Sequence, residues 1–357
     1  MNAAGMNQEQ NKTNGNEFPL VSLVIPAFNE EKYIGSLLDQ MLHQDYPQDK
    51  IEIFVADGGS TDKTREIVSS YALKNPGIKL LLNKKQYVPF ALNMGIRESK
   101  GEYIIILGAH SSYPLNYISS LIKASLSLKA DNVGGLCIGN PPDSSLKALA
   151  IAQAMSSAFG VGDAHFRIGS KEIKQVDTVT FGCYKRSVFD HIGYFDEELL
   201  RNQDDKFNTK LTKNQGTIYL IPDIEVTYFT RATVSSVMKM FYQYGFFKPL
   251  VSLKIGRPTT LRQLVPFLFV VFIISSLGLG FLSSLFWKFL GAVLLLHLFL
   301  GIVFGLKIVG KTKRPGLLIY LPWLFFLIQT SYGWGYIRGI VKFIIFRQRI
   351  QGVGSTR

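Results

Sequence analysis

The sequence predicts an α/β domain with a mostly parallel sheet, followed by an α-helical transmembrane region. Over roughly the first 230 of its 357 residues, short β-branched runs alternate with stretches that carry apolar residues at helical spacing. Long uncharged runs follow. We expect a flexible arm over residues 1–18, the α/β domain over 19–230, amphipathic interface helices over 231–262, and a membrane region with a basic tail over 263–357.

The first elements of the α/β domain follow from the apolar pattern. Residues 20–25 and 51–56 are typical of buried strands, and Glu30 to His43 carries apolar residues on one face of a helix. Further along, the pattern predicts strands over 79–82 and 103–107 and a helix over 89–99. This alternation favours parallel strands joined by crossover helices.

The positive charge is concentrated in the apolar part of the chain. The formal net charge is +13, yet no acidic residue follows Glu225, while 16 Lys and Arg lie between Arg231 and the end. The first 225 residues are therefore slightly acidic. Basic residues beside apolar runs favour contact with anionic lipid, so we expect a bilayer as partner and no nucleic acid.

Three uncharged runs predict membrane spans near 264–286, 289–306 and 317–334. The basic residues on either side of the first two runs indicate a cytoplasmic α/β domain in a multi-pass protein of the cell membrane. Three spans would put the C-terminus outside, but Arg338 and Lys342 favour the inside. A re-entrant third segment or a fourth crossing would each resolve this conflict.

The first residues carry no signal for export, and the cysteines carry no signal for a metal–thiolate site. The first 18 residues are polar and have no apolar stretch typical of a signal peptide. Cys137 and Cys183 are the only cysteines, and they form no Cys-x-x-Cys pair. We expect both to be core thiols.

Polar and glycine-rich segments follow the first two predicted strands. The first is Pro26 to Glu30, and the second is Asp57-Gly58-Gly59-Ser60. Ligands of open parallel sheets bind at the carboxyl ends of the strands, where glycine lets a ligand approach the backbone. Each segment alone fits an ordinary strand-to-helix turn, but the pair on successive strands predicts a ligand site.

These and further motifs resemble the inverting family 2 glycosyltransferases of GT-A fold, especially the succinoglycan-biosynthesis (ExoA-like) type. The matching segments run in the family's order over positions 20–230. They are Val-Ile-Pro-Ala-Phe-Asn-Glu at 24–30, Val-Ala-Asp-Gly-Gly-Ser-Thr-Asp at 55–62, Ala-Leu-Asn-Met-Gly-Ile at 91–96, Ala-His-Ser with Tyr-Pro at 109–114, and Arg-Asn-Gln-Asp-Asp at 201–205.

The resemblance implies a UDP-sugar donor, with Asp57 reading the uracil and Asn93 near the diphosphate. The donor-binding residues it implies are Pro26, Ala27, Phe28, Glu30, Asp57, Gly58, Gly59, Asn93 and Ala109. It also implies a polyprenyl-diphosphate-linked oligosaccharide as acceptor. The acceptor-binding residues it implies are Gly182, Arg201, Asn202 and Gln203.

One departure from the family concerns its metal site. Relatives place Asp-x-Asp or Asp-x-His at the strand end that here reads Gly108-Ala109-His110. The resemblance implies a divalent cation, Mn²⁺ or Mg²⁺, with His110 as a ligand. Because Gly108 replaces the first Asp, either the cation is held weakly or another carboxylate substitutes.

Inverting transfer needs a base that takes the proton of the acceptor hydroxyl, which one carboxylate can do. The resemblance implies Asp204 for this role, with Asp205 beside it as a second catalytic residue. A neighbouring negative charge favours the protonated form of a carboxyl group, which raises its pKa. Read without the family, the pair would be an acidic helix N-terminus that is favourable to the helix dipole.

The predicted function is a membrane-anchored inverting glycosyltransferase that moves a sugar, with glucose expected, from a UDP-sugar to a lipid-linked oligosaccharide for exopolysaccharide or surface glycan synthesis. An alternative is a catalytically degenerate relative that binds nucleotide-sugar or acts as a scaffold, because of Gly108. A small transporter is disfavoured, since the spans carry few ionisable residues.

Overall fold

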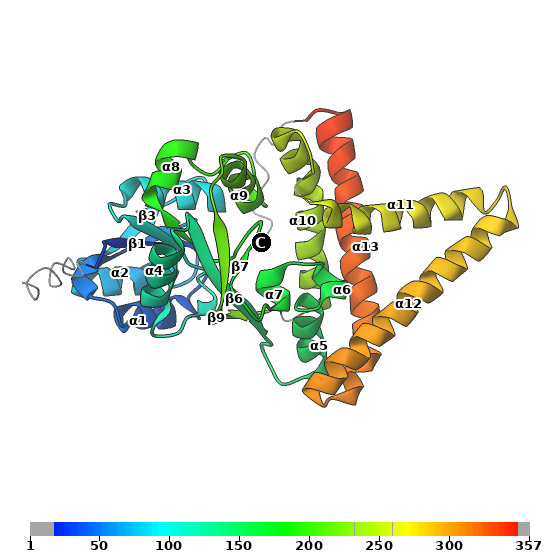
Figure 1. Cartoon of the computed structure of the whole chain (residues 1–357), viewed down its shortest axis with the longest axis horizontal. Helices are drawn as coiled ribbons and strands as arrows, with labels where there is room; N and C mark the ends of the chain where they lie inside the picture. The colour runs from blue at the N-terminus through cyan, green and yellow to red at the C-terminus, as the bar shows by residue number, and fades with distance from the viewer. Residues whose placement is uncertain (1–17, 232, 259, 349–357) are drawn as a thin grey trace, which may run out of the picture.

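The computed structural model describes residues 18–231, 233–258 and 260–348, so the predicted arm and the end of the basic tail lie almost wholly outside the described residues. An α/β domain occupies one side of the molecule, and a set of long helices from the C-terminal part of the chain lies against it (Figure 1). The predicted architecture, an α/β domain followed by apolar helices, is confirmed.

A nine-stranded sheet forms the centre of the α/β domain, in the order β3-β2-β1-β4-β8-β6-β9-β5, with β7 beside β9. Strands β3, β2, β1 and β4 are parallel, as predicted. Beyond them, β8 runs antiparallel to both of its neighbours, while β6 and β9 are parallel. The strands are β1 (Val21–Ala27), β2 (Ile51–Asp57), β3 (Ile78–Leu82), β4 (Tyr103–Ile106), β5 (Ser111–Ser112), β6 (Asn132–Asn140), β7 (Lys174–Gln175), β8 (Cys183–Lys185) and β9 (Ile218–Phe229).

Helices cover both faces of this sheet. The first of them buries Ile34, Leu37, Leu38 and Met41, the apolar face expected from the sequence. Cys183 lies in the core beneath these helices, and both cysteines are buried and free, as predicted. The helices of the domain are α1 (Ile34–Leu42), η1 (Gln48–Lys50), α2 (Thr64–Lys74), α3 (Val88–Glu98), α4 (Tyr117–Leu128), α8 (Arg186–Ile192) and α9 (Gln203–Lys213).

Three further helices connect β6 to β7 and lie between the domain and the C-terminal helices. They are α5 (Leu146–Met155), α6 (Ala158–Val161) and α7 (His165–Ile168). The C-terminal elements are α10 (Val234–Ile255), η2 (Leu261–Gln263), α11 (Leu264–Leu279), α12 (Ser284–Thr312), η3 (Pro315–Ile319), α13 (Leu321–Gly339) and η4 (Ile340–Ile345).

Helices α10 and α13 pack side by side with their backbones almost touching (Figure 1). A Cβ atom added to Gly245 would lie 2.0 Å from the carbonyl oxygen of Tyr332, and one added to Gly335 would lie 2.2 Å from that of Tyr242. Only glycine permits this approach. Phe241 and Phe247 of α10, expected at a membrane interface, are instead buried within the protein.

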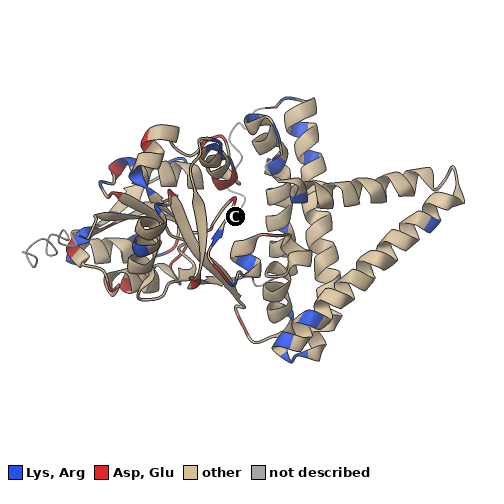
Figure 2. Cartoon of the chain, viewed as in Figure 1, with Lys and Arg blue, Asp and Glu red and all other residues tan. Residues whose placement is uncertain are grey.

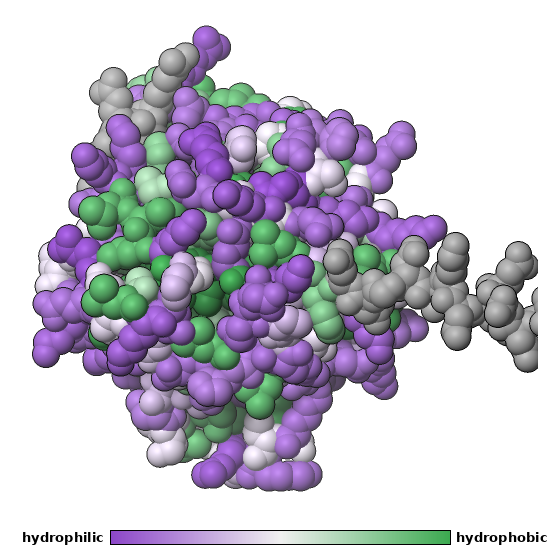
Figure 3. All heavy atoms as spheres, turned by 90° about the vertical axis from the view of Figure 1, so that its left-hand side faces the viewer, coloured by the Kyte–Doolittle hydropathy of each residue, from purple (hydrophilic) through white to green (hydrophobic). Residues whose placement is uncertain are grey.

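Helices α11 and α12 project away from the rest of the protein as a V-shaped pair (Figure 1). Among the described residues, the helices long and apolar enough to cross a membrane are Leu261–Leu279 and Ser284–Thr312. They expose large apolar side chains such as Leu268, Leu295 and Phe299, which are 57–68% exposed. The opposite end of the molecule, in contrast, shows a mainly hydrophilic surface (Figure 3).

The third predicted span differs from the other two. Residues 317–334 form most of η3 and α13, and α13 packs mainly along α10 while it also contacts α11 and α12. Its buried residues include Leu324, Phe325 and Ile328. Within the described part of the chain, two helices, not three, thus have the length and composition of a crossing segment.

The charge distribution follows the same division. Figure 2 shows Asp and Glu on the α/β domain and only Lys and Arg on the C-terminal helices. Two basic residues of α12, Lys307 and Lys311, lie near its C-terminal end, just before η3, and a third, Lys288, lies near its N-terminal end.

Candidate active site

The first candidate site lies where β1 and β2 end. These strands are paired in register, so that Ala27 lies opposite Asp57. Asp57 is 1% exposed, and its carboxylate accepts hydrogen bonds from the backbone amides of Gly59, at 3.0 Å, and of Ser60, at 3.1 Å. Arg65 also approaches it, at 3.7 Å. Asp57 therefore stabilises the turn that follows β2.

The loop after β3 closes over this turn. Gly59 has a φ of +81°, a conformation that favours glycine, and the side chain of Gln86 lies against it. A Cβ added to Gly58 would come within 3.2 Å of the Gln86 carbonyl oxygen. The two glycines thus let the segments that follow β1, β2 and β3 approach one another. The predicted residues Pro26, Ala27 and Phe28 lie at the same edge of the sheet.

His110 lies between this edge and β9. Its Nδ1 atom is 3.2 Å from a carboxylate oxygen of Glu30, which brings together two residues that are far apart in the sequence. The His110 ring is also 5.2 Å from the ring of Tyr228. Ala109 beside it is buried.

The described side chains do not form a cation site by themselves. A Cβ added to Gly108 would lie 2.5 Å from the ring of Phe181, so an aspartate at 108 would require that ring to move. Across the described residues, no three His, Cys, Asp or Glu side chains group as metal ligands. Glu30 and His110 make only a pair, and ligation by His110 stays a prediction.

Two of the predicted ligand residues, Asn93 and Gly182, also hold parts of the fold together, and their contact with a ligand stays a prediction. The side-chain amide of Asn93 donates to the carbonyl oxygen of Phe195 and to Glu197, both at 2.9 Å, and its oxygen accepts from the Phe195 amide at 3.0 Å. Its polar atoms are thus used in tying α3 to the loop before α9. Gly182 packs in the sheet against Asn132, where no side chain would fit, and does not line the cavity described next.

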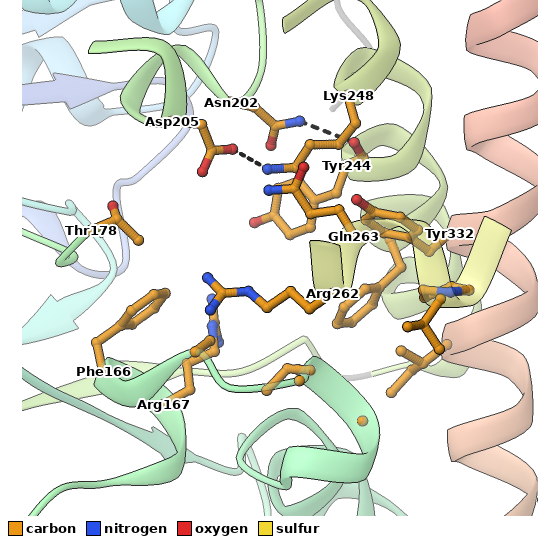
Figure 4. Close-up of a pocket in the computed structure, with 18 of the residues that line it drawn as sticks. Phe166, Arg167, Thr178, Asn202, Asp205, Tyr244, Lys248, Arg262, Gln263 and Tyr332 are labelled. Atoms are coloured by element: carbon orange, nitrogen blue, oxygen red, sulfur yellow. Dashed lines mark hydrogen bonds and ion pairs between the residues drawn. The ribbon is translucent and has the colours of Figure 1, made fainter. Parts of the chain in front are cut away.

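A cavity of about 500 Å³ lies between the α/β domain and the C-terminal helices (Figure 4). Its polar wall comes from α7 and the start of α9, and its opposite wall from α10, α11 and α13. Three of the predicted acceptor residues, Arg201, Asn202 and Gln203, line it together with both predicted catalytic aspartates. The residues from the C-terminal helices include Tyr244, Lys248, Arg262, Val265, Pro266, Ile328, Gln329 and Tyr332.

Asp204 and Asp205 occupy the first turn of α9, which begins after Asn202 in a left-handed conformation. Asn202 donates a hydrogen bond to the carbonyl oxygen of Tyr244 at 3.0 Å, and Lys248 forms an ion pair with Asp205. Asp204 has no such partner among the described side chains, and its own side chain is accessible from the cavity. The free carboxylate is therefore the one that a ligand can reach.

The surroundings change the acidity of Asp204. Although the Asp204 side chain is exposed to the cavity, the protein packed around it displaces water and disfavours its charged form, and the negative charge of Asp205 adds to this effect. Lys248 opposes both, and the result raises the pKa of Asp204 to about 6. Such a carboxylate is charged at neutral pH yet takes up a proton more readily than an ordinary aspartate.

Two arginines reach into the cavity from opposite walls, and in Figure 4 the side chains of Arg167 and Arg262 point toward one another. Arg262 is ion-paired with Asp163 and, at 2.9 Å, with Asp177. Arg167 lies over the ring of Tyr228, 5.8 Å from its centre. Burial lowers the pKa of Arg167, but nearby acidic groups, Asp204 among them, more than offset this and raise it.

Sequence reasoning missed the cationic wall of the cavity. Arg167 lies in a four-residue helix outside every recognised motif, and Lys248 and Arg262 come from segments assigned to the membrane interface. Their approach to Asp204 depends on how the C-terminal helices dock. A lone arginine such as Arg167 carries no signal in the sequence that would mark it.

Known proteins are similar to most of this chain. Residues 22–193 match the glycosyl transferase family 2 model. The dolichyl N-acetyl-α-D-glucosaminyl phosphate 3-β-D-2,3-diacetamido-2,3-dideoxy-β-D-glucuronosyltransferase of Methanococcus voltae is 30% identical over 330 residues, which cover 90% of this chain and 97% of that protein. The succinoglycan biosynthesis protein ExoA of Rhizobium meliloti is 28% identical over 246 residues, covering 68% of this chain and 73% of that protein.

Among solved structures, the mannosyltransferase PcManGT of Pyrobaculum calidifontis, in complex with GDP-Man and Mn²⁺, has the same fold. It superposes with a TM-score of 0.57 at 19% identity, covering 90% of this chain and 87% of that one. The predicted family and enzyme class are confirmed. The chain is a glycosyltransferase and belongs to glycosyl transferase family 2.

Proposed function

We propose that this glycosyltransferase moves a sugar from a UDP-sugar to a lipid-linked acceptor with inversion at the anomeric carbon. The observation that carries the proposal is Asp204, an unpaired carboxylate with a pKa of about 6 at a cavity shared by the α/β domain and the apolar helices. This is where a base must lie to serve an acceptor that arrives from a membrane.

In the proposed reaction, Asp204 accepts the proton of the acceptor hydroxyl as its oxygen attacks the anomeric carbon from the face opposite the diphosphate. The bond between that carbon and the β-phosphate oxygen breaks, and its electron pair leaves with UDP. Asp205 is not the proposed base, because its carboxylate is ion-paired with Lys248. Its part is to position Lys248 and to raise the pKa of Asp204.

For the donor, we propose the edge where β1 and β2 end. Pro26 to Phe28, Glu30, Asp57 to Gly59 and Ala109 are the proposed residues on the nucleoside side, with glucose as the first sugar to test. Asn93 acts from a distance, since its amide holds the loop before α9. The described side chains offer only the pair Glu30 and His110 as metal ligands, so no step of the proposed reaction is assigned to a metal ion.

For the acceptor, support comes from the two unlike walls of the cavity and from the relatives. The Methanococcus voltae enzyme is named for a dolichyl-phosphate-linked sugar, and the Rhizobium meliloti protein for succinoglycan biosynthesis. We propose a polyprenyl lipid that carries its sugar through a phosphate or diphosphate. Arg201, Asn202 and Gln203 are the proposed contacts to the sugar, because they precede Asp204 along the same wall.

We further propose that α11 and α12 cross the cell membrane as a hairpin, with α10, α13 and the catalytic domain on the cytoplasmic side. Leu261–Leu279 is about 28 Å long, close to the thickness of the hydrocarbon layer. Arg257 precedes the hairpin, and Lys311 lies at its C-terminal end, just before η3. Lys288, near the tip, is the basic residue on the proposed outer side. Because α13 packs on α10, it adds no third crossing, and the basic C-terminal residues stay inside.

The test is UDP release by the full chain in detergent, with UDP-glucose first and other UDP-sugars after it. The acceptor is a short polyprenyl-diphosphate-linked sugar. We expect release that depends on the acceptor and a product of inverted configuration by NMR. Binding of UDP-sugars without turnover on any acceptor would contradict the proposal and favour a degenerate, nucleotide-binding relative.

A further inference from the structure

Arg167 is an unneutralised cation inside the cavity. Among the described residues, its guanidinium has no carboxylate within ion-pair distance and no hydrogen-bond acceptor. Its neighbours are the rings of Phe166, 5.4 Å away, and Tyr228, 5.8 Å away. A guanidinium has five N–H donors, and no described acceptor uses those of Arg167, so they are available to a ligand.

Three other cations that join the two halves of the protein are each paired with a carboxylate. Lys248 is paired with Asp205, and Arg262 with Asp163 and Asp177. Lys254 is paired with Asp196 at 2.8 Å and with Glu198 at 2.6 Å. Arg167 differs from these three cations because it has no carboxylate partner among the described residues. Its side chain and that of Arg262 converge in one part of the cavity (Figure 4).

A second polar group of the cavity also lacks a partner. The hydroxyl of Tyr332 is buried in the wall formed by α13, and it has no hydrogen-bond partner within the part of the chain that the structure describes. An unused hydroxyl and an unused guanidinium at one cavity indicate a ligand with several acceptor oxygens. A phosphate group has them and matches the geometry of arginine.

The remaining wall of the cavity is apolar and leads to the projecting helices. Val265 and Pro266 open α11, and Ile328 lies on α13. Val265 is 61% exposed, so the apolar lining continues onto the surface of α11. A ligand with a phosphate at Arg167 can therefore extend an apolar chain toward the membrane helices.

We propose that Arg167, with Arg262 beside it, binds the phosphate of a polyprenyl phosphate lipid, whose chain leaves between α11 and α13. The proposal rests on the proposed function, and it assigns the acceptor's phosphate to named residues. A phosphate held there presents the attached sugar next to Asp204, which lines the same cavity. The charge of Arg167 also offsets the repulsion between phosphate and carboxylate.

The direct test is binding of farnesyl phosphate to the full chain in a neutral detergent, measured by calorimetry. Farnesol and inorganic phosphate serve as the two partial ligands. We expect Arg167→Ala to weaken farnesyl phosphate binding about 10-fold to 100-fold, the worth of a charge-assisted hydrogen bond. Arg167→Lys should recover part of the loss. The matched control is Lys79→Ala, which removes an exposed cation over the ring of Phe54, on β3 at the edge of the sheet.

Several outcomes of this test would overturn the proposal. Equal binding of farnesol would show that the site reads only the apolar chain, and equal binding of inorganic phosphate would show a free-phosphate site; either overturns the proposal. So does unchanged farnesyl phosphate binding in Arg167→Ala. Loss of UDP binding in that variant would assign Arg167 to the donor instead.

A kinetic readout separates this site from the proposed function. In Arg167→Ala we expect the KM for the lipid acceptor to rise, with the KM for the UDP-sugar and the thermal stability unchanged. If the wild-type chain binds farnesyl phosphate through Arg167 but transfers no sugar, the proposed function fails and the lipid site stands. If transfer occurs and Arg167→Ala leaves the acceptor KM unchanged, the lipid site fails and the proposed function stands.

Discussion

Lys248 of α10 donates a hydrogen bond to the carboxylate of Asp205 at the start of α9, so a helix beyond the α/β domain is ion-paired with the residue next to the proposed base. The neighbouring Asn202 is bonded to the backbone of the same helix. The C-terminal helices are therefore part of the candidate active site as well as a candidate anchor. Changes in them are expected to alter the chemistry.

The first prediction concerns the pH dependence of transfer. A base must be deprotonated, so kcat/KM should be full above the pKa of Asp204, about 6, and should fall as the pH drops through it. Asp205→Asn removes a charge that raises this pKa, so the midpoint should move down. Lys248→Met removes one that lowers it, so the midpoint should move up, each by roughly one unit.

The check is a set of pH–rate profiles at low acceptor concentration. Asp223→Asn, an exposed aspartate of β9, is the matched control and should leave the midpoint in place. Midpoints that move in the same direction for Asp205→Asn and Lys248→Met would contradict the electrostatic account.

The second prediction concerns the contact between α10 and α13. In Gly245→Ala, the new methyl group would lie 2.0 Å from the Tyr332 carbonyl oxygen, so the helices must separate. We expect a loss of about 3 kcal/mol in unfolding free energy, near the upper end of overpacking costs, and a matching fall in Tm in detergent. Gly310→Ala in α12 has open space and should cause no loss. Equal Tm values for the two variants would show that the close packing is not needed.

The third prediction concerns the membrane topology. Cys137 and Cys183 are buried, so an introduced cysteine can be labelled selectively in intact cells. Leu282→Cys, at the tip between α11 and α12, should react with a membrane-impermeant maleimide from outside. Gln348→Cys should react only after the cells are permeabilised. Labelling of Gln348→Cys from outside would mean that α13 crosses the membrane.

The fourth prediction concerns the divalent cation. Position 108 offers no carboxylate, and Glu30 and His110 make a pair rather than a set of three ligands. Mn²⁺ alone should therefore show no binding by calorimetry. Any Mn²⁺ binding should require UDP, whose phosphate oxygens would supply the missing ligands, and His110→Ala should weaken it. Tight binding of Mn²⁺ to the protein without nucleotide would contradict this.

The parallel half of the sheet could be predicted from the sequence because its information is local. The runs at 20–25 and 51–56 are apolar and bounded by Pro26 and Asp57, and the structure has strands there within two residues at each end. The pairing of strands β6 and β9 could not be predicted from a local pattern. Their pairing shifts register between Gly135 and Leu136, and it joins segments about 90 residues apart.

The site could be predicted only where residues adjoin along the chain. Arg201, Asn202, Gln203, Asp204 and Asp205 all line one cavity, as the motif implied. Asn93 and Gly182 lie in recognised motifs too, yet their environment uses them for packing and hydrogen bonds. Arg167 and Lys248 reach the cavity through tertiary contacts that no sequence spacing encodes.

The fifth prediction concerns Asp204 itself. Asp204→Asn keeps the size of the side chain but cannot accept the proton, so kcat should fall about 10²-fold to 10⁴-fold. Binding of UDP should hardly change, because the proposed donor residues lie at the ends of β1 and β2 and not in α9. Asp223→Asn is again the matched control.

The most direct measurement is therefore made on one preparation of Asp204→Asn: the rate of acceptor-dependent UDP release, together with the affinity for UDP by calorimetry. Our account predicts a nearly inactive enzyme that still binds UDP as the wild type does. Full activity, or an equal loss of activity and UDP affinity, would contradict the assignment of Asp204 as the base.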